Sequence, residues 1–131
     1  MPTRRYDDAI MSIRNQWKRG LTLKAVAAEY GVDPGDLDRV FRRKYGVTAF
    51  AYVRSRREAY LLDRLADTEV YGYEIGSELG FFDDWSFYRW VKRGFGISFT
   101  RLRSKVVKGK GDAIRRAQEL RRKRTLPRTR R

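Results

Sequence analysis

The chain has 131 residues and a formal net charge of +15 at pH 7, from 31 Lys and Arg against 16 Asp and Glu, which indicates a polyanionic partner. Cysteine and histidine are both absent, and this excludes disulfides, Cys nucleophiles, zinc fingers and every His-dependent catalytic or metal site. No apolar run is long enough for a membrane span or a signal core, so we expect a cytoplasmic protein that makes no membrane contacts.

The N-terminal third of the chain predicts three helices. An amphipathic helix is expected over Tyr6–Arg19, and its apolar stripe is interpreted as a packing surface. A short Ala-rich helix follows over Leu23–Tyr30, with Thr22 as its N-cap. After a turn at Gly31, a third helix is expected over Pro34–Tyr45, between an Asp cap and a C-terminal glycine.

The middle of the chain predicts a connector and then a second pair of helices. A helix over residues 48–66 contains no Gly or Pro, and we expect it to be stiff. A bend at residues 67–72 precedes a short helix and a longer one over about residues 84–94. One further helical turn is expected at Thr100–Arg103.

One pattern occurs twice in this chain, over Ala25–Thr48 and over Glu74–Ser98. Each copy predicts a short helix, a turn at a glycine, an Asp N-cap and a second helix that ends in Gly. That order is a helix-turn-helix, and two copies in a basic protein predict binding to a DNA duplex at two places. The matched pairs are Val26/Ile75, Glu29/Glu78, Gly31/Gly80, Asp33/Asp83, Leu37/Phe87, Arg39/Arg89, Phe41/Val91, Arg42/Lys92, Tyr45/Phe95 and Gly46/Gly96.

The predicted organisation is an all-α domain of about seven helices over residues 1–104, followed by a basic tail. The first helix-turn-helix is expected at about residues 22–46, the linker helix at 48–66 and the second helix-turn-helix at about 72–96. The tail, residues 105–131, has 12 Lys and Arg and two acids, a net +10. We expect it to be frayed in the free protein, with a helix over residues 112–124 compatible with binding to nucleic acid.

Helical spacing separates the buried from the outward faces of the two longer helices. Apolar stripes are expected at Leu37, Val40, Phe41 and Tyr45 in the first copy, and at Phe87, Trp90, Val91 and Phe95 in the second. The opposite faces carry Gly35, Arg39, Arg42 and Arg43 in the first, and Trp85, Ser86, Arg89, Lys92 and Arg93 in the second.

Both outward faces have an arginine at the centre and two bases one turn later. Arginine donates two hydrogen bonds to a guanine edge, and the later bases reach phosphates, so we expect Arg39 and Arg89 to read sequence. Trp85 fits stacking on a sugar, contact with a thymine methyl, or a cap on the preceding turn. Because Gly35 has no side chain and acids flank Arg39, the hypothesis is that Arg89→Ala abolishes site selection whereas Arg39→Ala only reduces it.

These residues resemble the AraC/XylS family of bacterial transcription regulators, over roughly Ile13 to Arg103. The most specific segment is GFFDDWSFYRWVKRGFGIS, matched at Gly80, Phe81, Asp83, Phe87, Arg89, Lys92, Phe95 and Gly96. Upstream, Ala27, Gly31, Leu37, Arg39, Phe41, Gly46, Tyr52, Arg57 and Leu65 also fall in register. The resemblance implies two reading helices in successive major grooves, and a short member that has no effector domain.

The resemblance also implies a set of DNA-contacting residues and marks some departures. Base readers are expected at Gly35, Asp38, Arg39, Asp84, Trp85, Ser86, Tyr88 and Arg89, and phosphate contacts at Arg42, Arg43, Thr48, Lys92 and Arg93. The family has Pro where Phe99 stands, and larger residues where Gly72, Gly76 and Val91 stand. Because Gly in a helix costs about 1 kcal/mol, the helix before the second turn is expected to be loose.

Two functions fit these patterns. The first is a sequence-specific transcription regulator that binds double-stranded DNA as a monomer and, as an activator, also contacts RNA polymerase. The second is a non-specific or architectural binder, or the DNA-targeting component of a phage or mobile-element complex. An enzyme is not expected, and neither is a cofactor or metal, because the acid pairs Asp7/Asp8, Asp33/Asp36 and Asp83/Asp84 are interpreted as helix-start residues.

Overall fold

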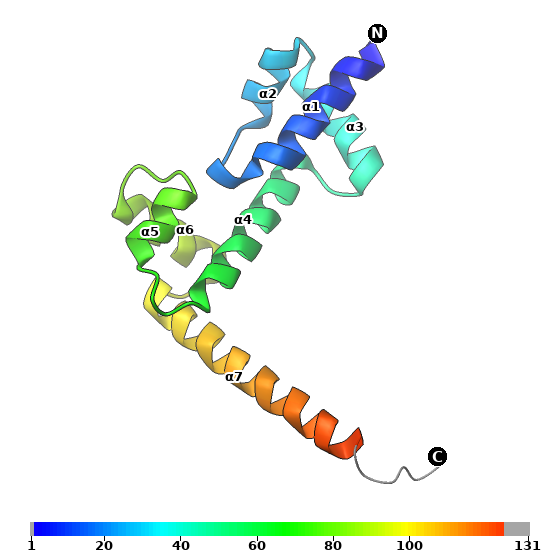
Figure 1. The fold of residues 1–131 in the computed structure, drawn as a ribbon. Helices are drawn as coiled ribbons and strands as arrows, with labels where there is room; N and C mark the ends of the chain where they lie inside the picture. Colours follow the sequence, from blue (N-terminus) through cyan, green and yellow to red (C-terminus); the bar gives the residue numbers. More distant parts are fainter. Residues whose placement is uncertain (1, 125–131) are drawn as a thin grey trace.

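The computed structural model describes residues 2–124, and these form seven α-helices and one short 3₁₀ helix (Figure 1). The elements are α1 (Pro2–Gln16), η1 (Trp17–Arg19), α2 (Leu23–Tyr30), α3 (Pro34–Tyr45), α4 (Ala49–Leu65), α5 (Gly72–Glu78), α6 (Asp84–Phe95) and α7 (Phe99–Arg124). The predicted all-α fold is confirmed, with one helix-turn-helix unit at each end of the linker helix α4.

The helices form two separate hydrophobic cores, one on each half of α4. The first core joins α1, α2, α3 and the start of α4, and its largest fully buried side chains include Ile10, Ile13, Leu37 and Phe41. The second joins the end of α4 to α5, α6 and α7 through Leu61, Leu65, Ile75, Leu79, Phe87, Val91 and Leu102. The expected stripes are confirmed, with Leu37 and Phe41, then Phe87 and Val91, fully buried.

The helix boundaries follow the capping residues that the sequence indicated. Asp33 accepts from the Asp36 amide at 3.0 Å, and Asp83 accepts from the Ser86 amide at 2.6 Å, so equivalent acids start α3 and α6. At the other ends, Gly46 and Gly96 have φ of 77° and 76°, a left-handed conformation that side-chain-bearing residues rarely adopt. The sequence repeat is therefore a structural repeat.

A half-buried arginine connects the two units across the linker helix. Arg57 of α4 donates from Nε to the carbonyl oxygen of Lys18 at 3.2 Å and from Nη2 to that of Leu79 at 2.8 Å. Its guanidinium carbon also lies 5.0 Å from the ring centroid of Phe81 and 5.1 Å from that of Trp90. Burial lowers the pKa of Arg57, but an arginine stays charged at neutral pH, so both bonds are charge-assisted.

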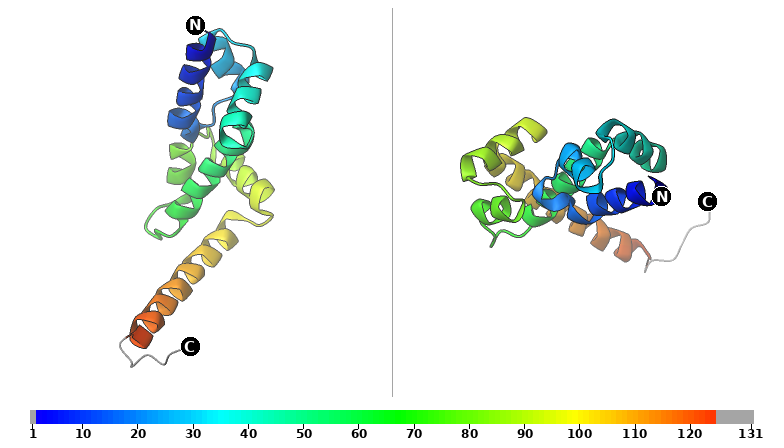
Figure 2. Two further views of the ribbon diagram at one scale, coloured as in Figure 1. Left: turned by 90° about the vertical axis from the view of Figure 1, so that its right-hand side faces the viewer. Right: turned by 90° about the horizontal axis from the view of Figure 1, so that it is seen from above.

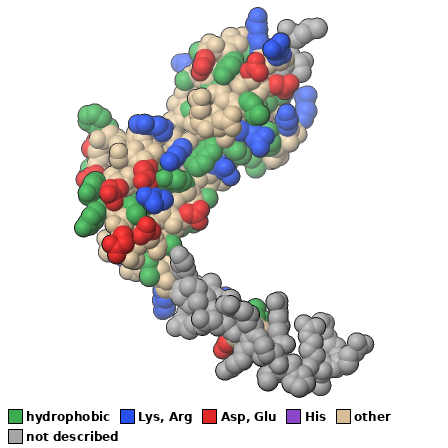
Figure 3. All heavy atoms as spheres, viewed as in Figure 1, with side chains coloured by type: hydrophobic (Ala, Val, Ile, Leu, Met, Phe, Trp, Pro, Cys, Tyr) green, Lys and Arg blue, Asp and Glu red, His purple; other side chains and the backbone are tan. Residues whose placement is uncertain are grey.

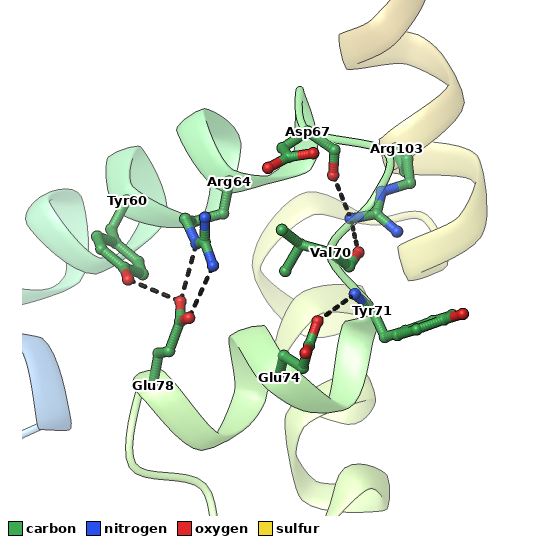
Figure 4. Close-up of polar contacts among 8 residues, drawn as sticks. All are labelled: Tyr60, Arg64, Asp67, Val70, Tyr71, Glu74, Glu78 and Arg103. Atoms are coloured by element: carbon green, nitrogen blue, oxygen red, sulfur yellow. Dashed lines mark hydrogen bonds and ion pairs between the residues drawn. The ribbon is translucent and has the colours of Figure 1, made fainter.

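Polar contacts then attach α5 and α7 to α4 (Figure 4). Glu78 accepts from Nε and Nη2 of Arg64, at 2.9 and 2.7 Å, and from the Tyr60 hydroxyl at 2.7 Å. Arg103 of α7 donates to the carbonyl oxygens of Asp67 and Val70 in the turn before α5. These bonds attach α5 to α4 through Glu78 and attach α7 to the turn before α5.

The expectation that α5 is loose is not supported by how it packs. Gly72 and Gly76 are both buried, and a Cβ at Gly76 would lie 2.9 Å from Cγ of Phe87. A Cβ at Gly72 would lie 2.5 Å from the Tyr88 hydroxyl. The glycines let α6 approach α5 closely, and we infer that this packing offsets their lower helix propensity.

The prediction for the end of the chain is wrong. Instead of one turn at Thr100–Arg103 and a frayed tail, α7 is a continuous helix from Phe99 to Arg124. Its start is fixed in the second core by Leu102, and the residues that follow include many strong helix formers, so a nucleated helix propagates. The expected border at residues 104/105 lies inside this helix, and residues 125–131 of the tail lie outside the described part of the chain.

Candidate nucleic-acid interface

The second helices of the two units, α3 and α6, lie on the same side of the molecule (Figure 2). Both views in Figure 2 place them together, with α1 and α5 on the opposite side and α4 between the units. A duplex running along that side would meet both helices, as two major-groove readers require.

The outward face of α6 combines an exposed aromatic ring with three bases. Trp85 is 67% exposed, and the guanidinium carbon of Arg89 lies 5.0 Å from its ring centroid, one helical turn away. Lys92 and Arg93 are exposed on the following turn. Stacking of Arg89 on Trp85 restricts the orientation of the guanidinium while leaving its N–H groups free to donate in the plane of the fork.

The end of α6 and the start of α7 enclose a groove of about 700 Å³ beside this face. It is lined by Trp85, Tyr88, Arg89, Lys92, Arg93, Ser98, Phe99 and Thr100. Tyr88 packs edge-on against Phe99, with centroids 5.3 Å apart, so it contributes to the wall and is 39% exposed. The groove brings together five of the predicted DNA-contacting residues from α6.

Three lining residues of the groove, at the start of α7, were missed as site residues by the sequence reasoning. Ser98 is the equivalent of Thr48, because each stands two residues after a helix-ending glycine. The Thr48 hydroxyl accepts from the Ala51 amide at 3.1 Å, and the Ser98 hydroxyl accepts from the Arg101 amide at 3.3 Å. The repeat itself was the signal that would have found Ser98, since Thr48 was already assigned to phosphate.

The face of α3 is more open and more acidic than that of α6. Gly35 is exposed and offers only backbone, while Arg42 and Arg43 are exposed one turn after Arg39. Asp36 lies in the first turn of α3, as expected, and also pairs with Arg39 at 2.9 Å. Arg39 at the centre of the α3 face thus forms an ion pair with a carboxylate, whereas Arg89 at the centre of the α6 face stacks on the indole of Trp85.

Several predicted contact residues also have structural functions. The Asp38 carboxylate accepts from the Ala49 amide at 2.9 Å, so it caps α4 as well as lying on α3. Ser86 is half-buried beside the Asp83 cap, whereas Asp84 is exposed at the start of α6. Base contacts by these three side chains remain predictions.

Charge is distributed by sign over the second unit. Apart from Asp84 at its start, the charged residues of α6 are the bases Arg89, Lys92 and Arg93, whereas α5 and the turn before it carry Asp67, Glu69, Glu74 and Glu78. Figure 3, which views the α5 side, shows acidic side chains gathered there. This polarity favours a polyanion on the α6 side and disfavours one on the α5 side.

The acid pairs give no metal site in the part of the chain that the structure describes. Among the residues whose side chains the structure describes, no three Asp or Glu gather closely enough to hold an ion. Asp33 and Asp83 are helix caps, as expected, but Asp7 and Asp8 lie within α1, so their interpretation as helix-start residues is wrong. No helix among the described residues is both long and apolar enough to cross a membrane.

Comparison with known proteins gives one family and structural neighbours that include two response-regulator domains. A family model described as "Helix-turn-helix domain" matches residues 26–105. The C-terminal domain of the two-component response regulator yesN from Fusobacterium nucleatum aligns with a TM-score of 0.60 and 23% identity, over 74% of this chain and 96% of that one. The C-terminal domain of AraT, a response regulator from Geobacillus stearothermophilus, aligns with a TM-score of 0.55 and 23% identity, over 77% and 84%. A search of curated proteins found no match.

Proposed function

The chain belongs to the family of AraC-type helix-turn-helix domains, which bind DNA and regulate transcription, and from that premise we propose that it is a sequence-specific, cytoplasmic regulator. In this proposal α3 and α6 enter successive major grooves of one double-stranded DNA, about 34 Å apart. The observation that carries the proposal is the placement of both helices on one side of the molecule with equivalent basic faces.

The proposed base readers are Gly35, Asp38, Arg39, Asp84, Trp85, Ser86, Tyr88 and Arg89, and the proposed phosphate contacts are Arg42, Arg43, Thr48, Lys92 and Arg93. Arg89 is the strongest of these, because its exposed guanidinium stacks on Trp85 and forms no ion pair with the described residues, whereas Arg39 pairs with Asp36. A bidentate arginine–guanine contact is worth about 1–3 kcal/mol of discrimination. We therefore expect Arg89→Ala to remove site selection and Arg39→Ala to weaken it, and equal losses in a competition assay would refute the asymmetry.

The experiment that tests the proposal is selection of bound duplexes from a random DNA pool at moderate salt. Enrichment of two short blocks about ten base pairs apart would identify a two-groove reader and its site. Tight binding without enrichment would support the alternative, in which the protein is a non-specific or architectural binder or targets a larger phage or mobile-element complex to DNA. Steep salt dependence is expected in either case, because six to ten phosphate contacts cost roughly three to five decades of affinity between 50 and 200 mM salt.

Two further parts of the proposal need separate measurements. The protein is proposed to bind as a monomer, which the mass of its complex with one selected duplex would test. If it activates transcription, it also contacts RNA polymerase, and a retained promoter complex with the purified polymerase would support that contact. Selectivity that survives deletion of residues 105–131 would support the regulator, whereas loss of all binding would support the non-specific role.

A further inference from the structure

The last helix, α7, leaves the body of the protein on the side opposite to the two reading helices. Among the α7 side chains that the structure describes, the last buried one is Leu102, and Val106 packs at the edge of the second core. From Val106 to Arg124 the helix continues for 18 residues, about 27 Å at the rise of an α-helix. Both views in Figure 2 show its far end displaced toward the side of α1 and α5, away from α3 and α6.

This projecting part of α7 is strongly basic. Residues 105–124 contain nine Lys and Arg and two acids, a net +7 within the helix. Where their side chains are described, Lys105, Lys108 and Arg116 are all exposed. A surface of this charge attracts nucleic-acid phosphates without reading their sequence.

An acidic surface separates α3 and α6, where the first DNA segment would bind, from this helix. The α5 side of the second unit, which lies between them, carries Asp67, Glu69 and Glu74 beside the Arg64–Glu78 ion pair, and it repels a phosphate backbone. A duplex bound along α3 and α6 would therefore have to wrap around an acidic surface to reach the far end of α7.

We propose that the projecting part of α7, residues 105–124, is a second and sequence-independent binding surface for duplex DNA, so that one molecule bridges two DNA segments. The reading helices hold the first segment and the basic helix holds the second. This inference goes beyond the proposed regulatory function, since a regulator that reads one site has no need of a second surface on its far side.

A bridging assay tests it with the full chain. A duplex carrying the selected site is fixed to beads, protein is bound at one molecule per duplex, and a labelled duplex of random sequence is added. If selection yields no motif, any tightly bound duplex serves on the beads, so failure of the proposed function does not hide the result. We expect the labelled duplex to be captured whatever its sequence.

Matched variants assign the capture to α7. The triple variant Lys105→Gln/Lys108→Gln/Arg116→Gln removes three exposed bases and keeps good helix formers, so the helix should persist. Each lost phosphate contact lowers the salt slope of capture by about 0.9, so the variant should lose most of the captured label while still binding the bead duplex. The control variant Arg4→Gln/Arg5→Gln/Lys24→Gln removes three exposed bases from the first unit and should capture normally.

Four results would overturn the proposal. Capture only of labelled duplexes that carry the site would mean that two copies of the protein associate, each holding its own DNA. Equal capture by the two triple variants would mean that α7 is not the second surface. If no label is captured and the α7 variant binds the bead duplex more weakly than the control does, α7 contacts the same duplex as α3 and α6. If an RNA hairpin is captured but DNA is not, the surface binds RNA.

Discussion

Substitution of Arg57 is expected to make the two helix-turn-helix units less rigid relative to each other, because this residue hydrogen-bonds to both. Arg57→Ala removes the hydrogen bond to the Lys18 carbonyl of the first unit and the bond to the Leu79 carbonyl of the second. It also removes the stacking of the guanidinium on Phe81 and Trp90. A hydrogen bond from a charged donor contributes about 1.5–3 kcal/mol and a cation–π contact about 0.5–1 kcal/mol, and such terms overlap, so we expect a net loss of about 3 kcal/mol.

The adjacent arginine provides a matched control. Arg56 is exposed and makes one cation–π contact with Trp17, at 4.9 Å, so Arg56→Ala removes the same charge at a cost of about 0.5–1 kcal/mol. Arg57→Lys keeps the charge but cannot bond both carbonyls with a planar fork, so it should fall between the two alanine variants in free energy of unfolding. Urea denaturation of all three variants measures the difference.

The functional assay uses DNA sites in which the spacing between the two recognised blocks is changed by one base pair. One base pair rotates the second block by about 35° around the helix axis, so a rigid pair of readers should reject the altered site. The wild type and Arg56→Ala should discriminate strongly between spacings, whereas Arg57→Ala should accept both more evenly. If Arg57→Ala is no less stable than Arg56→Ala and rejects the altered site as strongly, the reasoning is refuted.

Three further outcomes follow from local geometry. Gly80→Ala should lower the thermal stability more than Gly46→Ala. Both glycines have positive φ, so both variants are strained, but a Cβ at Gly80 would also lie 3.1 Å from the Arg19 carbonyl oxygen, whereas one at Gly46 would meet nothing within 4 Å. Hydrogen bonds from Arg64 and Tyr60 lower the pKa of Glu78. The stability that Glu78 contributes is therefore fully present above the ordinary pKa of Glu and is lost as the pH falls through the lower pKa of the folded state. In urea unfolding from about pH 6 to about pH 3, Glu78→Gln should lose less stability with falling pH than the wild type. Asp36→Asn should tighten DNA binding by up to about fivefold in a titration, because it removes a negative charge and an exposed ion pair worth at most about 1 kcal/mol, and unchanged or weaker binding would contradict this.

Helix boundaries were predictable from the sequence because they depend on residues close together in the chain. Thr22, Asp33 and Thr48 each cap the helix that the sequence placed after them, and Gly46 ends α3 as expected. Capping exchanges hydrogen bonds within three or four residues, so no knowledge of the fold is needed. The repeat then predicted the second unit from the first.

The positions of side chains between helices could not be predicted in the same way. Asp38 was assigned to bases because it lies on α3, but the angle between α3 and α4 brings its carboxylate to the Ala49 amide. Arg57 was noted only as a residue in register with a family, since its partners are 39 and 22 residues away. Such contacts depend on interhelical angles, which periodicity does not contain.

The glycines of α5 show why a local rule was misleading in the second unit. Helix propensity alone predicts that Gly72 and Gly76 weaken α5, but the aromatic side chains of α6 occupy the space that larger residues would need. An aromatic-rich α6 and a glycine-containing α5 thus compensate each other in volume. A residue that looks unfavourable on one helix is explained by the residue that faces it on another.

The arrangement of charge also explains how so basic a protein could remain selective. A uniform excess of +15 would hold DNA against every face, and non-specific contacts would compete with reading. Here the α5 side is acidic, the α6 side is basic, and the largest basic segment projects away from both on α7. Attraction on α7 raises the local concentration of DNA without occupying the reading face, and repulsion at α5 limits non-productive orientations. Glu69→Lys, which reverses an exposed acid in the turn before α5, should therefore increase total DNA binding while reducing the preference for the selected site, and a preference that stays unchanged would refute this account.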